Sequence, residues 1–182
     1  MKFKNNVLKT IYTRRSVRNY SDKKVSKDII NELLNAAVMA PSARNTQPWN
    51  FHIICGKKNV DKFVKYALKK INTIIKAGIK LTIKSLFFNA PLLIIISGPK
   101  KYKWLKEDTN LAVQNMFLAA KSLGLGSCWI GYAMGLNNHK KAREELNIEK
   151  NNIISAILIF GYPKNKKEII PKRLPKIKKW IE

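Results

Sequence analysis

Hydrophobic and polar residues alternate along this chain in patterns that predict helices and short buried strands. Apolar residues recur at helical spacing in residues 29–38, after Ser26 as an N-cap and Asp28 in the first turn, and Pro41 ends this helix. Residues 109–123 are apolar on nearly every side, which predicts a central helix capped by Gly124. The same pattern predicts helices at 7–13, 60–70, 72–87 and 137–146, and strands at 50–55, 92–97, 127–130 and 153–160.

The C-terminal segment has a different pattern. Pro171 and Pro175 exclude a continuous helix, so the segment is expected to run extended. Its apolar residues Ile177, Trp180 and Ile181 need a surface to cover, and one domain does not obviously offer it. Because no internal repeat or low-complexity linker interrupts the chain, residues 1–182 are interpreted as one domain, with residues 167–182 as an extended tail.

Composition narrows the class of protein. Of the 182 residues, 46% are hydrophobic, which suffices for a core. The longest apolar run, residues 90–97, is much shorter than the roughly 20 residues that span a bilayer, and the first residues lack the apolar stretch of a signal peptide. Cys55 and Cys128 lie far apart without metal-ligand spacing. We therefore expect a cytoplasmic chain with no membrane segment and no metal site.

The net charge of +25 raises the question of nucleic acid. The basic residues are mostly lysines scattered through every segment, and Lys, Asn and Ile are all residues of A/T-rich codons. A dedicated nucleic-acid interface is therefore not expected, although it stays an alternative. A field this positive attracts anions, including nucleotides and acidic substrates.

The side chains alone offer no familiar catalytic machinery. His52 and His139 have no partner carboxylate nearby in sequence, and Ser42 lacks the setting of a hydrolase nucleophile. The G-L-G of residues 124–126 is too short for a dinucleotide fingerprint, and no paired-carboxylate site is present. If the protein is an enzyme, a cofactor carries the reaction.

Four segments indicate which cofactor. Residues 14–18 concentrate arginines in a chain that otherwise uses lysine, and guanidinium groups bind phosphate oxygens in bidentate fashion. If this segment is extended, Arg14, Ser16 and Arg18 point the same way, although a solvated basic turn is the alternative. Residues 40–49 combine two prolines with Ser, Asn and Gln side chains. The glycines of residues 124–131 allow close approach of a flat ring, and residues 171–175 hold a cation pair between prolines.

Together these segments, R-R-S-x-R, P-S-x-x-N-x-Q-P-W, G-L-G-S-x-W and P-K-R-L-P, resemble the FMN-dependent nitroreductase family over residues 14–175. The resemblance implies an α+β fold with a mixed, mainly antiparallel central sheet sandwiched by helices. It also implies an intertwined homodimer with C-terminal strand exchange, in which the tail packs on the partner subunit.

The resemblance further implies the cofactor-binding residues, while the chemistry takes place on FMN and no side chain is catalytic. Arg14 and Ser16 would bind the phosphate or ribityl chain with Lys172 and Arg173, and Arg18 would place a cation beside flavin N1 and O2. One segment would reach the flavin of the other subunit, and the backbone after the 127–130 strand would lie beside N5. The implied set is Arg14, Arg15, Ser16, Arg18, Pro41, Ser42, Asn45, Gln47, Ile130, Gly131, Lys172 and Arg173.

Two members of this set carry alternatives. Arg15 fits a surface charge as well as a ligand, and Gln47 fits a brace for its loop. The implied activity is ping-pong transfer of electron pairs from NAD(P)H through FMN to a small acceptor such as a nitroaromatic or a quinone. The alternative is a flavin-binding sensor or flavin-cleaving protein of the same fold.

Overall fold

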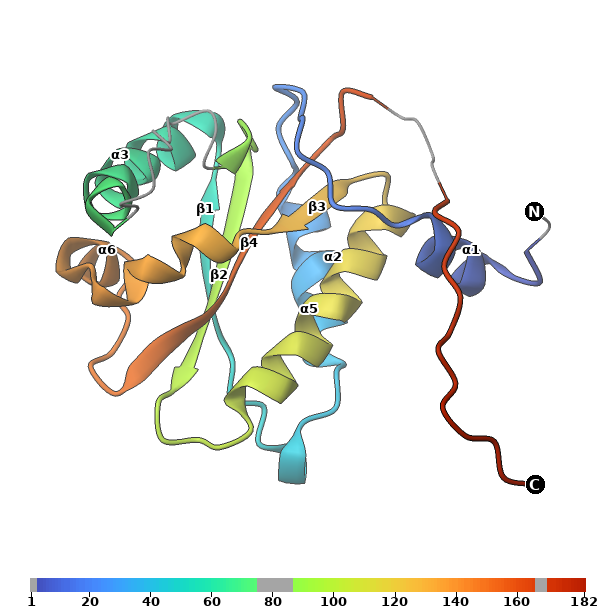
Figure 1. The fold of residues 1–182 in the computed structure, drawn as a ribbon. Coiled ribbons are helices and arrows are strands. Elements are labelled where there is room, and N and C mark those ends of the chain that lie inside the picture. The colour runs from blue at the N-terminus through green and yellow to red at the C-terminus, as the bar shows by residue number, and fades with distance from the viewer. Residues whose placement is uncertain (1–2, 75–86, 166–169) are drawn as a thin grey trace.

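The computed structural model describes residues 3–74, 87–165 and 170–182 and is built on one antiparallel sheet (Figure 1). Its four strands lie in the order β1-β2-β4-β3. The central strands, β2 (Leu92–Pro99) and β4 (Asn152–Gly161), pair along their length with one irregularity between Ile96 and Ser97. The outer strands are β1 (Asn50–Cys55) and β3 (Gly126–Trp129).

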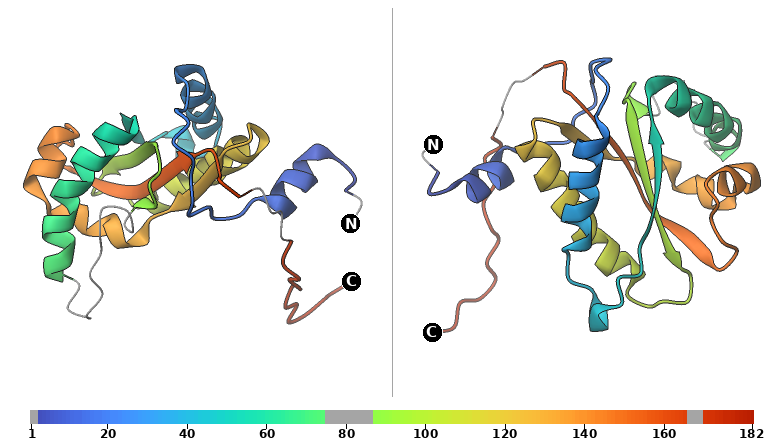
Figure 2. Two further views of the ribbon diagram at one scale, coloured as in Figure 1. Left: turned by 90° about the horizontal axis from the view of Figure 1, so that it is seen from above. Right: turned by 180° about the vertical axis from the view of Figure 1, so that it is seen from behind.

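Helices cover both faces of the sheet (Figures 1 and 2). Leu92, Ile94 and Ile96 pack against α2 (Lys27–Val38) and α5 (Leu105–Ser122). The alternate residues Leu93 and Ile95 pack against the other layer. Successive strand residues point to opposite faces, so β2 is buried on both sides. The second layer contains α3 (Lys57–Ile74), the 3-10 helix η2 (Gly131–Asn138) and α6 (Lys140–Glu145).

Local sequence signals explain where several helices begin and end. Ser26 caps α2 by accepting a hydrogen bond from the Ile29 N–H, as the sequence predicts. At the end of α5, Gly124 has φ +76° and donates its N–H to the Lys121 carbonyl, while the Leu125 N–H bonds back to Ala120. This Schellman ending turns the chain directly into β3.

Most strand predictions are confirmed. The strand at 50–55 has the predicted bounds, and those at 92–97 and 153–160 extend to Leu92–Pro99 and Asn152–Gly161. The strand predicted at 127–130 is found one residue earlier, at Gly126–Trp129. The four strands pair antiparallel, and within the described residues the parallel component is a single isolated bridge between Ser16 and Ser127 at the edge of β3.

The helix predictions need more correction. The helix at 7–13 is confirmed as α1 (Asn6–Thr13), whereas α5 begins at Leu105 and leaves Leu111 46% exposed instead of burying every side. The predicted break between helices 60–70 and 72–87 is wrong, because α3 continues to Ile74. Residues 75–86 lie outside the described residues. The helix predicted at 137–146 is partly wrong, because η2 occupies residues up to Asn138 and His139 then caps the shorter α6.

Most of the described part of the C-terminal tail is exposed. Residues 170–182 form neither helix nor strand, pass close to α1 and then extend away from the sheet and its helices (Figures 1 and 2). Leu174, Trp180 and Ile181 are each more than 70% exposed. Residues 170–182 thus contain no helix, as Pro171 and Pro175 predict. In the described part of the chain no helix is long and apolar enough to cross a membrane.

Candidate functional site

Two of the four sequence segments lie side by side. Residues 14–18 run parallel to β3: Ser16 bridges Ser127, and the Val17 N–H donates to the Ser127 carbonyl at 2.9 Å. Gly126 makes this approach possible, because a Cβ there would lie 2.6 Å from the Val17 side chain. Thus a glycine of the third segment allows the arginine segment to pack against the edge of the sheet.

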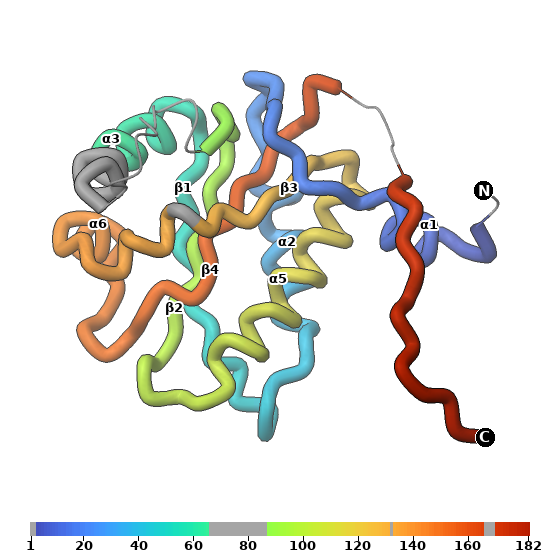
Figure 3. The backbone as a smooth tube through the Cα atoms, in the orientation of Figure 1, coloured from blue at the N-terminus to red at the C-terminus, as the bar shows by residue number. Residues whose placement is uncertain are grey.

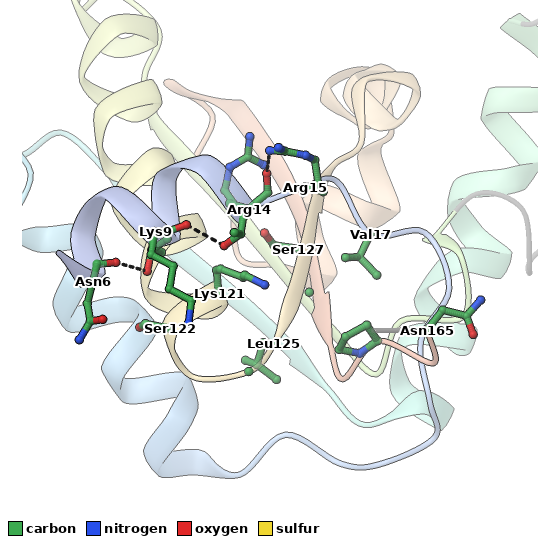
Figure 4. A pocket seen from close by; sticks show the side chains of 15 residues that line it. Asn6, Lys9, Arg14, Arg15, Val17, Lys121, Ser122, Leu125, Ser127 and Asn165 are labelled. Carbon is green, nitrogen blue, oxygen red and sulfur yellow. Dashed lines mark hydrogen bonds between the residues drawn. The ribbon is translucent and has the colours of Figure 1, made fainter. Parts of the chain in front are cut away.

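A cavity of about 530 Å³ opens where these segments meet α1 and the C-terminal end of α5 (Figure 4). Its walls are strongly basic and carry no acidic side chain. The lining residues are Asn6, Lys9, Thr10, Thr13, Arg14, Arg15, Val17, Lys121, Ser122, Gly124, Leu125, Gly126, Ser127, Pro163 and Asn165. Such a composition is suited to an anion.

Arg14 is a half-buried cation in this wall. Its half-buried guanidinium lies 5.7 Å from the centre of the Phe117 ring. Burial, followed by the positive charges of Arg15 and Arg173, lowers the pKa of Arg14 below its usual value. Among the described residues no carboxylate pairs with it. A bound anion would compensate this charge.

The neighbouring Arg15 is arranged differently. Its guanidinium donates hydrogen bonds to the backbone carbonyls of Tyr12 and Arg14, so part of its donor capacity serves the end of α1. This geometry favours a structural contribution from Arg15, even though the side chain also lines the cavity.

The remaining candidate residues of the first and third segments lie further along β3 and just after it. Ser16 and Arg18 are exposed, and the Arg18 guanidinium lies 5.9 Å from the centre of the Phe88 ring. The Ile130 N–H donates to the Ile157 carbonyl, which ties this backbone to β4. Gly131 is exposed, and a Cβ there would meet nothing within 4 Å. A flat group can therefore approach the backbone at this end of the strand.

The second segment lies elsewhere in the same chain. Its loop contains the 3-10 helix η1 (Ala43–Asn45) and is attached to the first turn of α5, where the Ala43 N–H donates to the buried Asp108 carboxylate at 3.1 Å. Lys121, which lines the cavity, lies in the last turn of α5. At 1.5 Å per residue these two turns are about 20 Å apart along the helix. The structure thus does not bring the loop to the cavity within one chain. Figure 3 shows the loop between α2 and β1 at the opposite end of α5 from β3.

Inside that loop, the predicted ligands are bonded to one another. Ser42 Oγ accepts a hydrogen bond from the Gln47 N–H at 2.9 Å, and Gln47 Nε2 donates to Asn45 Oδ1 at 3.1 Å. Pro41 precedes this cluster and is exposed. Gln47 therefore braces the loop in this structure.

Of the two tail cations in the implied set, Lys172 and Arg173, it is Arg173 whose charge reaches a residue of the cavity wall. Arg173 is close enough to Arg14 to lower its pKa, although the Arg173 side chain itself is exposed. Lys172 is also exposed.

Sequence reasoning missed several members of the cavity wall, including Lys9, Thr13 and Lys121. Lys121 carried one usable signal, because it lies in the last turn before the G-L-G segment. The buried carboxylate of Asp108 was also missed. In the described ranges no three His, Cys, Asp or Glu side chains gather as metal ligands would.

Comparison with known proteins gives a consistent result. A model of the nitroreductase family matches residues 11–162. A candidate NADH dehydrogenase/NAD(P)H nitroreductase of Archaeoglobus fulgidus is 36% identical over 166 residues, covering 88% of this chain and 87% of that protein. A 4-nitrobenzoate reductase of Pseudomonas putida is 25% identical over 208 residues, covering 91% and 89%.

A solved structure shares the fold over nearly the whole length. The crystal structure of a nitroreductase with bound FMN from Bacteroides fragilis superposes with a TM-score of 0.84 at 27% identity. The match covers 97% of this chain and 98% of that chain.

Proposed function

The chain belongs to the nitroreductase family, and on this premise we propose that it is an FMN-dependent oxidoreductase. It passes electron pairs from NAD(P)H through bound FMN to a small acceptor such as a nitroaromatic or a quinone. The donor and the acceptor use the site in turn, by a ping-pong mechanism. The relatives named for NAD(P)H and for 4-nitrobenzoate, and the neighbour solved with FMN, support this proposal.

The observation that carries the proposal is the half-buried Arg14. Burial and then two further arginines lower its pKa, and no described carboxylate compensates its charge, so the cavity is suited to a ligand of high negative charge. A phosphate monoester carries nearly two negative charges at neutral pH and accepts several charge-assisted hydrogen bonds. The phosphate of FMN therefore fits the residues present.

The remaining residues of the edge suit the rest of the cofactor. Ser16 and Ser127 lie on either side of the contact between the arginine segment and β3, and the exposed Arg18 follows in the direction of Gly131. When bound, FMN supplies the redox chemistry by taking up and releasing electron pairs. Gly131 leaves room for the ring beside the backbone, with Ile130 next to it.

Arg18 would tune the cofactor without acting as an acid or a base. A fixed cation near N1 and O2 favours negative charge added to the ring and so raises its reduction potential. Each 1.4 kcal/mol of such preference corresponds to about 30 mV for a two-electron couple. Lys172 and Arg173 of the tail would join Arg14 at the phosphate, in line with the effect of Arg173 on the Arg14 pKa.

The loop of Pro41, Ser42 and Asn45 would complete the site from a second copy of the chain. It lies at the opposite end of α5 from the cavity, so a homodimer that uses both ends is the simplest arrangement. The exposed Ile177, Trp180 and Ile181 support it, because a partner subunit would cover these side chains through exchange of the C-terminal segments.

An absorption spectrum followed by rapid mixing tests the proposal. We expect a yellow protein with about one FMN per chain, whose flavin absorbance is lost on mixing with NADH or NADPH and returns on adding a nitroaromatic or a quinone. Colourless protein that also fails to take up added FMN would contradict cofactor binding. Bound flavin that neither nicotinamide reduces would instead favour the sensor or flavin-cleaving alternative.

A further inference from the structure

The loop of residues 42–47 has an unusual backbone. Arg44, Asn45 and Gln47 have φ values of +56°, +52° and +47°, and none of them is glycine. The left-handed region is unfavourable for residues with a Cβ, so such a cluster persists only where surrounding contacts hold it. The contacts that hold this loop are therefore informative about its role.

Those contacts converge on one buried carboxylate. Asp108 is 3% exposed and accepts the Ala43 N–H on Oδ1 at 3.1 Å and the Tyr102 hydroxyl on Oδ2 at 2.8 Å. The Tyr102 oxygen also lies 2.7 Å from Thr46 Oγ1. Asp108 and Tyr102 thus attach the loop at both of its ends, through Ala43 and Thr46.

This arrangement determines which groups the loop can offer to a ligand. The Gln47 side chain donates a hydrogen bond to the side-chain oxygen of Asn45, so the amide nitrogen of Asn45 remains available to donate to a ligand. Ser42 Oγ accepts from the Gln47 N–H and keeps its own proton to donate. Among the described residues neither of these two donors has a hydrogen-bond acceptor. Both side chains therefore present donors, which is what carbonyl and ring nitrogen acceptors of a flavin require.

We propose that Asp108, assisted by Tyr102, is a positioning residue that holds the 42–47 loop in the shape in which Ser42 and Asn45 contact the flavin bound by the partner subunit. This positioning role rests on the proposed function. Asp108 does not cap its own helix, because the N-cap of α5 is Trp104 and makes no side-chain bond there. A buried carboxylate is costly unless it is bonded, and here its bonds go to the loop and to Tyr102, which also contacts the loop.

The test compares Asp108→Asn with Asp28→Asn in the full chain. Both aspartates lie in the first turn of a helix, but Asp28 is exposed, and among the described residues it makes no hydrogen bond to the loop. Asparagine keeps the shape of Asp108 but removes its negative charge, so the bond from Ala43 is no longer charge-assisted and the bond to Tyr102 survives only if the hydroxyl turns to accept it. We expect D108N to weaken FMN binding about tenfold or more, measured by quenching of flavin fluorescence, and D28N to leave it unchanged.

Riboflavin separates positioning from general damage. Riboflavin lacks the phosphate, so D108N should weaken the binding of riboflavin and of FMN by the same factor. The dissociation constant of riboflavin divided by that of FMN should then stay at the parent value. Misfolding would also reduce the contribution of the phosphate to FMN binding, so FMN would lose more affinity than riboflavin and this ratio would fall. If D108N does not fold, Tyr102→Phe decides, because it removes only a hydroxyl and should weaken FMN binding by about two- to tenfold.

The outcomes distinguish this inference from the proposed function. A parent that binds FMN, with D108N and Y102F binding it equally well, overturns the positioning role and leaves the proposed function intact. A ratio that falls in Y102F as well as in D108N also overturns the positioning role. A parent that binds no FMN overturns both.

Discussion

Arg14→Ala should weaken FMN binding by about ten- to a hundredfold. The half-buried guanidinium lies in the wall of the basic cavity without a described carboxylate partner, so alanine removes a cation that is available to the phosphate. A hydrogen bond to a charged group contributes roughly 1.5 to 3 kcal/mol, and each 1.4 kcal/mol is a factor of ten in the dissociation constant.

The same substitution should barely change the stability of the cofactor-free protein. It loses the contact of the half-buried Arg14 with the Phe117 ring, which is worth between about 0.5 kcal/mol at an exposed site and about 2 kcal/mol at a desolvated one. It also relieves the burial and the repulsion from Arg15 and Arg173 that lower the Arg14 pKa. The thermal midpoint should therefore shift by less than about 4 °C, since 1 kcal/mol corresponds to about 2–4 °C in a domain of this size.

Fluorescence titration of apoprotein with FMN, paired with thermal unfolding, measures both effects. Arg15→Ala is the matched control, because it removes the same charge from the adjacent residue. The Arg15 side chain is hydrogen-bonded to the backbone at the end of α1. Arg14→Lys should fall between the parent and R14A, since lysine keeps the charge and loses the bidentate fork. Equal losses of affinity in R14A and R15A would refute a specific phosphate contact and leave only general attraction by positive charge.

Two further predictions concern the ring and the tail. Arg18→Ala should lower the potential of the bound flavin by tens of millivolts in dye-equilibration measurements, with a smaller effect on affinity, and an unchanged potential would separate Arg18 from the ring. Deleting residues 176–182 should loosen the dimer and release FMN together, because Ile177, Trp180 and Ile181 would no longer cover a partner. A truncated chain that stays dimeric in sedimentation and keeps its colour would contradict this role.

Much of the fold could be predicted because its boundaries have strong local signals. The strand Asn50–Cys55 ends at Gly56, whose φ is +90°, and α2 begins after a serine cap. The beginning of α5 could not be predicted, since its N-cap is Trp104 and makes no capping bond. The predicted break in α3 had no Gly or Pro to cause it, and α3 continues through that point.

The candidate site was predictable in part for a similar reason. Arginines are rare in a chain rich in lysine, so residues 14–18 stood out, whereas Lys9 and Lys121 could not be told apart from the many scattered lysines. Asp108 was missed because its hydrogen bonds to Ala43 and Tyr102 form only in the folded chain, and no sequence motif indicates them. Hydrogen bonds between distant segments leave no periodic signal in a sequence.

Helix α5 explains how segments at two ends of one chain can serve one site. Its last turn borders the basic cavity, its first turn holds the 42–47 loop, and Leu111 between them is 46% exposed. In a twofold dimer the same surface is used by both subunits, so a pair of α5 helices lying antiparallel would bring the cavity of each chain next to the loop of the other. The partner's helix would then cover the exposed Leu111. The 20 Å between the two ends would set the spacing of two equivalent flavin sites along this interface.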